Sequence, residues 1–351
     1  MIRFDSDYLE GAHPKVLKKL VETNYEKTEG YGNDVYTKKA QEKIKKALKN
    51  EDVDIHFISG GTQTNMVVIS SALRSYEAII CPESGHINEH EAGAVESCGN
   101  KILTCKSMDG KLHIDSVKEI IKLHENEDLR EHRVKPKMVF ISLPTECGTN
   151  YTKKELVELY NYCKKKKLYL YIDGARLGYG LAAKDTDIRL EDLPNLCDVF
   201  YIGGTKQGTL MGEAVVIVNK SLKNDFRYCM KQKGALLAKG RILSVQFLAL
   251  FENDLYSKIS KVAVSQAMKI RKAFLDKGYE LYYDSYTNQQ FVIIDNNKLK
   301  ELEKNFSFYK WLKVDDKTVI RIVTSWATTE EEVDKLIEEV YYRICIITSH
   351  I

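Results

Sequence analysis

Short apolar runs alternate with amphipathic stretches over the first two-thirds of the chain. The apolar runs are short and strand-like: DIHFIS (54–59), EAIICP (77–82), KILTCK (101–106), KMVFISL (137–143), LYLYID (168–173), DVFYIGG (198–204) and EAVVIVN (213–219). Between several of them, amphipathic stretches such as IDSVKEIIKLHEN (114–126) and KKELVELYNYCKKK (153–166) predict helices. This alternation predicts an α/β fold with a mostly parallel sheet and helices on both faces.

The pattern changes near Lys220. A mainly helical stretch follows, and then come two strand-like segments, NQQFVIID (288–295) and TVIRIVTSW (318–326). The stretch TEEEVDKLIEEVYYRICII (329–347) predicts a closing helix that begins with acidic residues. We therefore predict a large domain at 1–250, opened by an N-terminal arm at 1–14, and a small C-terminal α/β domain at 251–351.

Composition and charge exclude several classes of function. The 351 residues carry a formal net charge of +3, and no basic stripe interleaves with aromatic residues, so we expect no nucleic-acid partner. No run has the length of a membrane span, and the N-terminus has no signal-peptide pattern. The eight cysteines form no C-x-x-C pair and no metal-ligand set, which favours a reducing cytoplasm and predicts no metal site.

The first stretch that could bind a ligand is FISGGTQTN, where a strand-like run ends in glycines and a helix begins. Backbone N–H groups at Gly60, Gly61 and Thr62 can approach an anion closely, and the start of a helix favours negative charge. The stretch is a candidate phosphate site, although it lacks the spacing of the common nucleotide-binding loops. The alternative is an ordinary strand-to-helix turn capped by Thr62 or Thr64.

Two further strand-like runs end in residues of opposite charge. The run LYLYID ends at Asp173, and Arg176 follows three residues later. Ligands in open α/β sheets bind at the carboxyl ends of strands, where an aspartate suits a protonated ring nitrogen. The alternative is a structural pair between Asp173 and Arg176.

The lysine in GGTKQGTLMG, Lys206, follows the next strand-like run. A lysine amine reacts with aldehydes when burial or neighbouring cations lower its pKa. We expect the surrounding glycines to allow a sharp turn and to leave room beside a flat ring. A phosphate site, a strand-end aspartate and a strand-end lysine, in this order, indicate pyridoxal 5′-phosphate. A non-catalytic phosphate-binding α/β protein would need only the first of them.

The stretch SGHINEHEAGA places His86 just after the run EAIICP. A lone histidine is commonly a satisfied polar residue. Beside the other three features, we expect its imidazole to stack on the cofactor ring.

These motifs resemble the threonine aldolase family, within the β-eliminating lyase group of fold-type-I pyridoxal-phosphate enzymes. The matching pieces are DGARL (173–177), HINEHEAGA (86–94), GGTQTN (60–65), GYGNDVY (30–36), FDSD (4–7) and IRIVTSW (320–326). The resemblance spans almost the whole chain. It implies a seven-stranded sheet sandwiched by helices, a smaller C-terminal domain, and homodimers or homotetramers with active sites at the subunit boundary.

The resemblance also implies roles for single residues. Lys206 would form the Schiff base with the cofactor, Asp173 would pair with its ring nitrogen, and His86 would stack on the ring. The cofactor phosphate would bind Gly61 and Thr62, with Gly60 nearby. Arg176 would lie near the ring hydroxyl or the substrate carboxylate. Ser6 and Arg321 would hold that carboxylate, and Tyr31 would reach a neighbouring subunit's site.

The implied activity is cleavage of the Cα–Cβ bond of a β-hydroxy amino acid, such as threonine to glycine and acetaldehyde. Many members carry a histidine after the strand that ends here in SLPTECGTN, whereas this chain has Glu146 and Cys147 there. The catalytic base therefore stays open between His86, Glu146 and a water held between them. The same difference motivates an alternative reaction, β-elimination or transamination of another amino acid.

Overall fold

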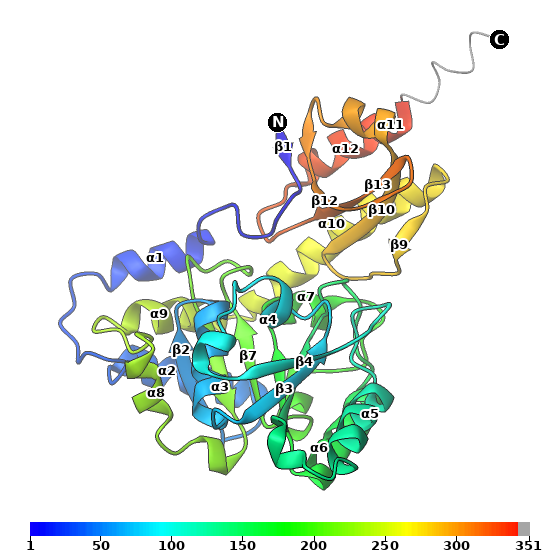
Figure 1. Cartoon of the computed structure of the whole chain (residues 1–351). Helices are drawn as coiled ribbons and strands as arrows, with labels where there is room; N and C mark the ends of the chain where they lie inside the picture. Colours follow the sequence, from blue (N-terminus) through cyan, green and yellow to red (C-terminus); the bar gives the residue numbers. More distant parts are fainter. Residues whose placement is uncertain (343–351) are drawn as a thin grey trace.

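A seven-stranded sheet forms the centre of the larger part of the molecule (Figure 1). The computed structural model describes residues 1–342. The strand order is β2-β8-β7-β6-β5-β3-β4, and only β8 runs antiparallel to its neighbours. The strands are β2 (Asp54–Ile58), β3 (Glu77–Pro82), β4 (Lys101–Cys105), β5 (Lys135–Ser142), β6 (Tyr169–Asp173), β7 (Val199–Gly203) and β8 (Glu213–Ile217). The mostly parallel sheet expected from the sequence is confirmed.

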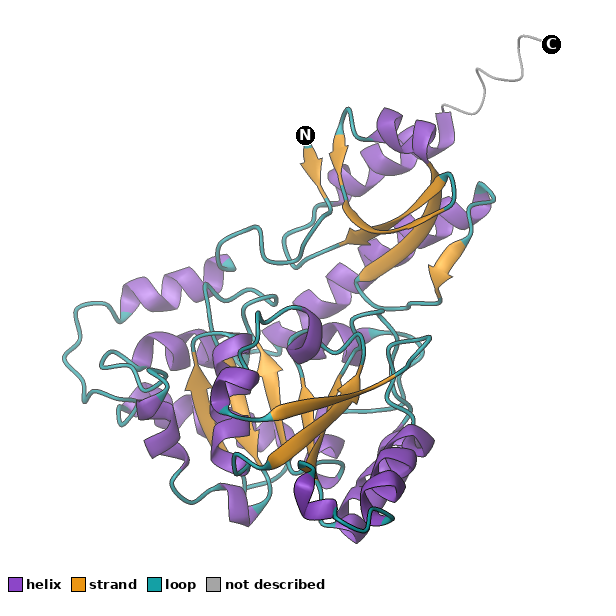
Figure 2. Cartoon of the chain, viewed as in Figure 1, coloured by secondary structure: helices purple, strands orange, loops and turns teal. Residues whose placement is uncertain are grey.

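Helices cover both faces of this sheet because its strands are apolar on both sides (Figure 2). In β7, Phe200 and Ile202 join one buried cluster, while Val199 and Tyr201 join the cluster on the opposite face. Residues of α3 (Gly61–Ala72), α4 (His86–Glu89) and α8 (Phe226–Gln232) pack into the second cluster. Residues of α1 (Pro14–Glu22), α2 (Val35–Leu48), α5 (Ile114–Glu125), α6 (Lys153–Lys166), α7 (Leu177–Ala182) and α9 (Arg241–Leu250) pack into the first.

A four-stranded antiparallel sheet forms the smaller part, in the order β12-β13-β10-β9. Its elements are α10 (Leu255–Asp276), β9 (Leu281–Tyr283), β10 (Gln289–Asp295), α11 (Asn296–Leu302), β12 (Tyr309–Val314), β13 (Lys317–Val323) and α12 (Glu330–Tyr342). The two predicted strands are confirmed as β10 and β13, whereas β9 and β12 were not predicted. The predicted end of the closing helix, at 343–347, lies outside the described residues. No helix within residues 1–342 is long and apolar enough to cross a membrane.

The N-terminal segment connects the two parts. β1 (Ile2–Arg3) pairs in parallel with β11 (Phe306–Ser307), and Val323 N donates a 2.8 Å hydrogen bond to Phe4 O. The chain then crosses to α1, which packs on the larger part (Figure 1). Residues 5–13 therefore run along the junction between the two sheets. The division into domains at 1–250 and 251–351 stays a prediction.

Candidate active site

The residues singled out in the sequence gather at one edge of the seven-stranded sheet. The parallel strands β2, β3, β5, β6 and β7 all end there, and β8 begins there because it runs in the opposite direction. Ser142 lies beside Asp173 in the register of β5 and β6, and Gly203 lies beside Glu213 in the register of β7 and β8. This edge is where α/β sheets bind their ligands.

Asp173 is buried at the end of β6 and is held by several donors. The Tyr201 hydroxyl donates to its Oδ1 at 2.5 Å, and the backbone N–H of Ala175 donates to the same oxygen at 2.9 Å. Asn65 Nδ2 lies 3.5 Å from Oδ2. Arg176 forms no ion pair with Asp173, so the structural pair considered for these two residues is wrong; Arg176 pairs with Asp7 instead. The second carboxylate oxygen, Oδ2, therefore has the weaker set of contacts and can accept a donor from a bound ring.

Lys206 lies in the loop after β7, with its Nζ 5.9 Å from the centroid of the Tyr8 ring. No hydrogen bond or ion pair joins Nζ to another residue between 1 and 342. Burial and the nearby Arg176 guanidinium lower the pKa of Lys206. Both effects favour the neutral amine, which is the form that attacks an aldehyde.

The glycines of this loop allow close packing of backbone rather than leaving open space. A Cβ at Gly203 would lie 2.3 Å from Ala175 O, and one at Gly204 would lie 2.6 Å from Gly212 O. Gly208 has a φ of +92°, which side chains rarely allow. The expectation of a sharp turn is met. Gly203, the last residue of β7, packs against the loop that follows Asp173, and Gly204 packs against Gly212 at the far end of the Lys206 loop.

Glu213 is a buried carboxyl group beneath the Lys206 loop that the sequence analysis missed. Its Oε2 accepts a 2.9 Å hydrogen bond from the backbone N–H of Gly204. Burial raises the pKa of Glu213 to about 7. The sequence did contain a signal for it. Glu213 opens the apolar run that follows the lysine loop, and charged residues are rare at buried strand ends.

Arg176 is held by Asp7 of the N-terminal segment. Its Nε donates to Asp7 Oδ2 at 2.7 Å and its Nη2 donates to Asp7 Oδ1 at 3.0 Å. Asn288 Nδ2 donates to Asp7 Oδ2 at 3.0 Å. Burial alone would raise the pKa of Asp7, but the charges of Arg176 and Lys206 outweigh burial and lower it. Asp7, in the N-terminal segment, thus contacts Arg176 of the larger part and Asn288 near the smaller sheet.

A second network links His86 to Asp173. His86 Nδ1 lies 2.8 Å from Glu91 Oε1, and Asn65 Nδ2 donates to the same oxygen at 2.7 Å. The Tyr171 hydroxyl donates to Asn65 Oδ1 at 2.6 Å. Burial lowers the pKa of His86, but the hydrogen bond to Glu91 and the charge of Asp173 outweigh burial and raise it. The imidazole is therefore fixed in place and favours its protonated form.

Glu146 lies in the loop after β5 and faces His86. Its Oε1 accepts hydrogen bonds from Ser142 Oγ at 2.6 Å and from the His86 backbone N–H at 3.1 Å. Burial raises the pKa of Glu146, and Asp173 adds to this effect. Its Oε2 is buried without a hydrogen-bond partner among the described residues.

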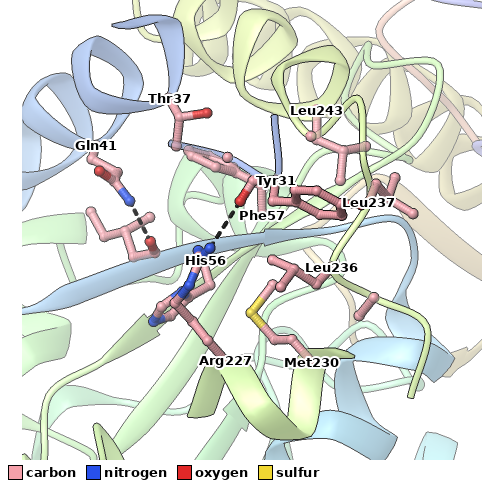
Figure 3. A pocket seen from close by; sticks show the side chains of 14 residues that line it. Tyr31, Thr37, Gln41, His56, Phe57, Arg227, Met230, Leu236, Leu237 and Leu243 are labelled. Atoms are coloured by element: carbon pink, nitrogen blue, oxygen red, sulfur yellow. Dashed lines mark hydrogen bonds between the residues drawn. The ribbon is translucent and has the colours of Figure 1, made fainter. Parts of the chain in front are cut away.

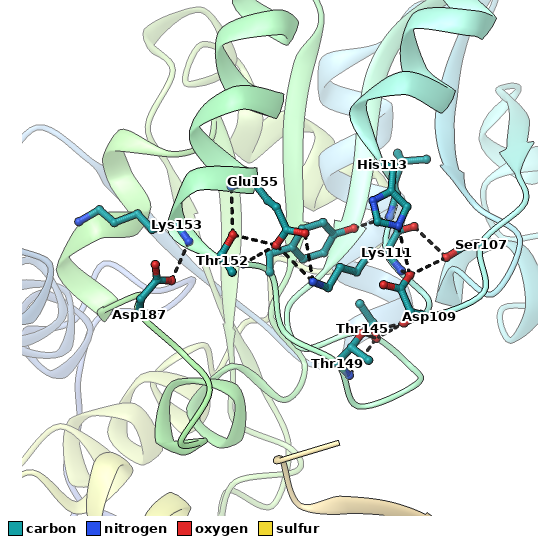
Figure 4. Close-up of polar contacts among 12 residues, drawn as sticks. Ser107, Asp109, Lys111, His113, Thr145, Thr149, Thr152, Lys153, Glu155 and Asp187 are labelled. Carbon is teal, nitrogen blue, oxygen red and sulfur yellow. Dashed lines mark hydrogen bonds and ion pairs between the residues drawn. The ribbon is translucent and has the colours of Figure 1, made fainter. Parts of the chain in front are cut away.

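Polar contacts hold the loop that carries Glu146 (Figure 4). Thr149 Oγ1 donates to Asp109 O at 2.7 Å, and Thr145 Oγ1 lies 2.7 Å from Thr149 Oγ1. The Asp109 side chain in turn accepts from Lys111 N at 3.0 Å. The loop after β4 therefore fixes the loop after β5, so Glu146 is presented by a rigid segment.

The predicted phosphate site lies at the start of a helix, as expected. Gly60 is the N-cap of α3 and no side chain caps the helix, so the alternative of a turn capped by Thr62 or Thr64 is wrong. Thr62 is exposed, and a Cβ at Gly60 would meet no atom within 4 Å. The first amides of α3 and the open space beside them fit a phosphate group.

Arg321 projects from β13 and stacks on two aromatic rings. Its guanidinium carbon lies 4.6 Å from the centroid of Tyr309 and 5.6 Å from that of Trp311. Its Nη1 and Nη2 make only long contacts, 3.4 Å each, with Gln289 Oε1 and with a backbone carbonyl oxygen. Burial and the Arg176 charge lower the pKa of Arg321 to about 10. Since no carboxylate of the described residues pairs with it, Arg321 is available to an anionic ligand.

One cavity of about 230 Å³ brings most of these groups together. Its lining includes five predicted residues, His86, Glu146, Arg176, Lys206 and Arg321, and four that the sequence analysis missed, Tyr8, His90, Tyr309 and Trp311. Asp173, Gly60, Gly61 and Thr62 lie at the same sheet edge but do not line it. Ser6 is buried, and its Oγ has no hydrogen-bond partner among the described residues.

Tyr31 lies in a different pocket, with Arg227 and His56 (Figure 3). Arg227 Nη2 donates to the Tyr31 carbonyl oxygen at 3.0 Å, and Lys231 Nζ lies 4.9 Å from the Tyr31 ring centroid. The Tyr31 side chain is 43% exposed. The structure of one subunit thus does not bring Tyr31 to Lys206, and its reach into a neighbouring subunit stays a prediction.

Comparisons with known proteins agree with this arrangement. The model of the beta-eliminating lyase family matches residues 4–297. A low specificity L-threonine aldolase from a Pseudomonas species is 32% identical over 343 residues, which cover 96% of each chain. One from Pseudomonas aeruginosa is 28% identical over 342 residues, again 96% of each chain.

Solved structures give the same result for the fold. The structure of a threonine aldolase from Leishmania major matches with a TM-score of 0.95 and 40% identity, covering 98% of this chain and all of that one. A histidinol-phosphate aminotransferase from Clostridium acetobutylicum matches with a TM-score of 0.72 at 13% identity, covering 97% of this chain and 98% of that one, which shows a shared fold alone. The resemblance and the fold class expected from the sequence are confirmed.

Proposed function

Because the chain belongs to the beta-eliminating lyase family, we propose that it is a pyridoxal-phosphate-dependent carbon–carbon lyase of the low-specificity threonine aldolase type. It cleaves the Cα–Cβ bond of a β-hydroxy amino acid and converts L-threonine or L-allo-threonine to glycine and acetaldehyde. The similarity to the Pseudomonas aldolase over nearly the full length of both chains supports this reaction.

The observation that carries the proposal is the placement of Asp173 and Lys206 at the carboxyl ends of the adjacent parallel strands β6 and β7. Asp173 is a buried carboxyl group with one lightly contacted oxygen, and the pKa of Lys206 is lowered. These are the groups needed at the two ends of a pyridoxal ring: an anion for its nitrogen and an amine for its aldehyde. When bound, pyridoxal phosphate supplies an electron-withdrawing ring that stabilises negative charge at the substrate Cα.

We assign cofactor binding to the following residues: Gly60, Gly61 and Thr62 for the phosphate, Asp173 for the ring nitrogen, Arg176 beside the ring hydroxyl, His86 on the ring face, and Lys206 for the aldehyde. The uncapped start of α3 supports the phosphate assignment. Glu91, which accepts a hydrogen bond from Asn65, holds His86 in a fixed orientation, and this supports a stacking role.

The substrate carboxylate is bound by Arg321 and by the free edge of Arg176. Two nitrogens of Arg176 are engaged by Asp7, so its Nη1 remains for a ligand. Arg321 lines the cavity without a carboxylate partner among the described residues. Ser6 and Tyr31 complete the proposed substrate site, with Tyr31 acting in the neighbouring subunit. His86 and Glu146 contact the reacting part of the substrate.

The proposal includes a homodimer or homotetramer in which subunits share active sites, in a reducing cytoplasm. Tyr31 is 43% exposed and its ring lies next to Lys231, which suits a role at a subunit boundary. Burial raises the pKa of the thiols of Cys81, Cys163 and Cys197, so these residues are unreactive core groups.

The test is aldehyde formation by the purified holoenzyme from L-threonine, L-allo-threonine, D-threonine and L-serine. We expect acetaldehyde and glycine from at least one threonine isomer, measured with a coupled alcohol dehydrogenase. The absence of aldehyde from every β-hydroxy amino acid would contradict the proposal. Release of ammonia or of a keto acid instead would identify β-elimination or transamination.

A further inference from the structure

The cavity around Lys206 contains an imidazole to which the proposed function gives no role. His90 caps the C-terminus of α4, where its backbone N–H donates to His86 O at 3.0 Å. Its ring lies edge-on to the His86 ring, with 5.6 Å between centroids and 61° between planes. His90 lines the same cavity as Lys206 and Arg321. The short helix therefore presents two imidazoles to one cavity.

In each of the other two candidate bases, one side-chain atom is already engaged by a neighbour. His86 Nδ1 is bound to the buried Glu91, and the raised pKa of His86 favours a ring that already holds its proton. Glu146 Oε1 accepts two hydrogen bonds, and the raised pKa of Glu146 favours a carboxyl group that donates. The raised pKa of each group disfavours the deprotonated form that would take a proton from a bound alcohol.

His90 has a different environment, because the residue lines the cavity and is also exposed to solvent. Neither ring nitrogen of His90 is hydrogen-bonded to another residue between 1 and 342. Burial lowers the pKa of His90, the neighbouring His86 ring and the charges of Arg321 and Lys206 lower it further, and Glu89 opposes them. The titratable and charged groups that line the same cavity are Tyr8, His86, Glu146, Arg176, Lys206, Tyr309 and Arg321. The ring nitrogens of His90 are thus open to a ligand in the cavity, and the lowered pKa favours the neutral form that a general base needs.

We propose that His90 is the base that removes the proton from the β-hydroxyl group of the substrate. This assignment rests on the proposed aldolase function. The hydroxyl proton moves to a ring nitrogen of His90, and the O–H electron pair forms the C=O bond of the aldehyde. The Cα–Cβ bond breaks, and its electron pair stays on Cα, which takes up a proton to give glycine.

The test compares two reactions of the same holoenzyme. Cleavage of L-threonine needs a base for the hydroxyl group, whereas exchange of the glycine α-hydrogen with D₂O does not, because glycine has no hydroxyl group. For His90→Gln we expect kcat for cleavage to fall about 100-fold or more, as for the loss of a general base, and glycine exchange to stay within about threefold of wild type. The control is His124→Gln in α5, outside the cavity, which leaves both reactions unchanged.

The pH profile gives a second readout. The acidic limb of log kcat/KM, which reports the base of the free enzyme, is present in the wild type and lost in His90→Gln. In the cofactor-free protein, NMR titration of the His90 ring gives a pKa below the ordinary value for histidine.

Three results would overturn the assignment. The first is cleavage by His90→Gln within about threefold of wild type. The second is an equal loss of cleavage and of glycine exchange in His90→Gln. The third is an acidic limb that remains in His90→Gln and disappears in Glu146→Gln. Failure of the wild type to cleave any β-hydroxy amino acid would instead refute the proposed function, and the role of His90 with it. The two failures are therefore distinguishable.

Discussion

Asp7 and Arg176 form a bidentate ion pair at the junction of the two sheets, with nitrogen–oxygen distances of 2.7 and 3.0 Å. The side chain of Asp7 is completely buried and that of Arg176 is 11% exposed. The pair lies beside Lys206 and joins the N-terminal segment to the loop after β6. The segment that crosses between the two sheets therefore contributes directly to the active site.

Loss of the Asp7 charge should destabilise the protein strongly. Asp7→Asn leaves the Arg176 guanidinium buried without its counter-charge, and breaking such a buried pair costs about 3–5 kcal/mol. Urea unfolding of the cofactor-free protein measures the change. The matched control is Asp5→Asn, since Asp5 pairs with the largely exposed Arg3 and its loss costs about 1 kcal/mol or less. Equal effects of the two substitutions would refute the structural role given to Asp7.

Asp173 should matter far more to the reaction than the hydroxyl group that supports it. Asp173→Asn keeps the shape of the side chain but removes the charge proposed for the ring nitrogen, so we expect kcat/KM to fall about 100-fold or more. Tyr201→Phe removes one hydrogen bond to the carboxylate, which is worth about 1.5–3 kcal/mol and thus corresponds to a fall of about 10- to 100-fold. Steady-state kinetics at saturating cofactor measures both. A smaller loss for Asp173→Asn than for Tyr201→Phe would contradict the pairing.

Glu213 should make the stability of the cofactor-free protein depend on pH. Its pKa is raised from 4.5 to about 7, so between these values the folded protein binds a proton that the unfolded chain has released. The contribution of Glu213 to the free energy of unfolding therefore falls as pH rises through this window and becomes constant above it.

Glu213→Gln has no titrating carboxyl group at this position. Its free energy of unfolding, relative to wild type, should rise between pH 4.5 and 7 and then stay constant, as measured by urea unfolding at several pH values. Glu331→Gln, an exposed change in α12, is the control and should show no such rise. A difference between Glu213→Gln and wild type that does not change with pH would show that Glu213 titrates in its ordinary range.

The sequence was sufficient for the groups that directly follow strands. Asp173 ends the apolar run that forms β6, and Lys206 and Glu146 lie in the loops after β7 and β5. A prediction of parallel strands therefore placed these side chains at one edge of the sheet. His86 follows β3 for the same reason. The location of each of these residues could be predicted from the local sequence pattern and from the rule that ligands bind where parallel strands end.

The missed groups depend on contacts between distant segments. Asp7 reaches the site because β1 pairs with β11, about 300 residues away, and no periodic pattern in FDSDYLEG predicts such pairing. The aromatic residues Tyr309 and Trp311 alternate with charged residues in YKWLKV, which was a recognisable strand signal. His90 was visible in HINEHEAGA, but only the short helix α4 shows that it shares a cavity with Lys206.

The central claim is that Lys206 holds the cofactor. Sodium borohydride reduction of the holoenzyme fixes pyridoxal phosphate on the lysine that carries it, and peptide mapping by mass spectrometry identifies that lysine. The account predicts a single adduct on Lys206, and none in a Lys206→Ala variant treated in the same way. An adduct on any other lysine of the wild-type enzyme, or no adduct at all, would contradict it.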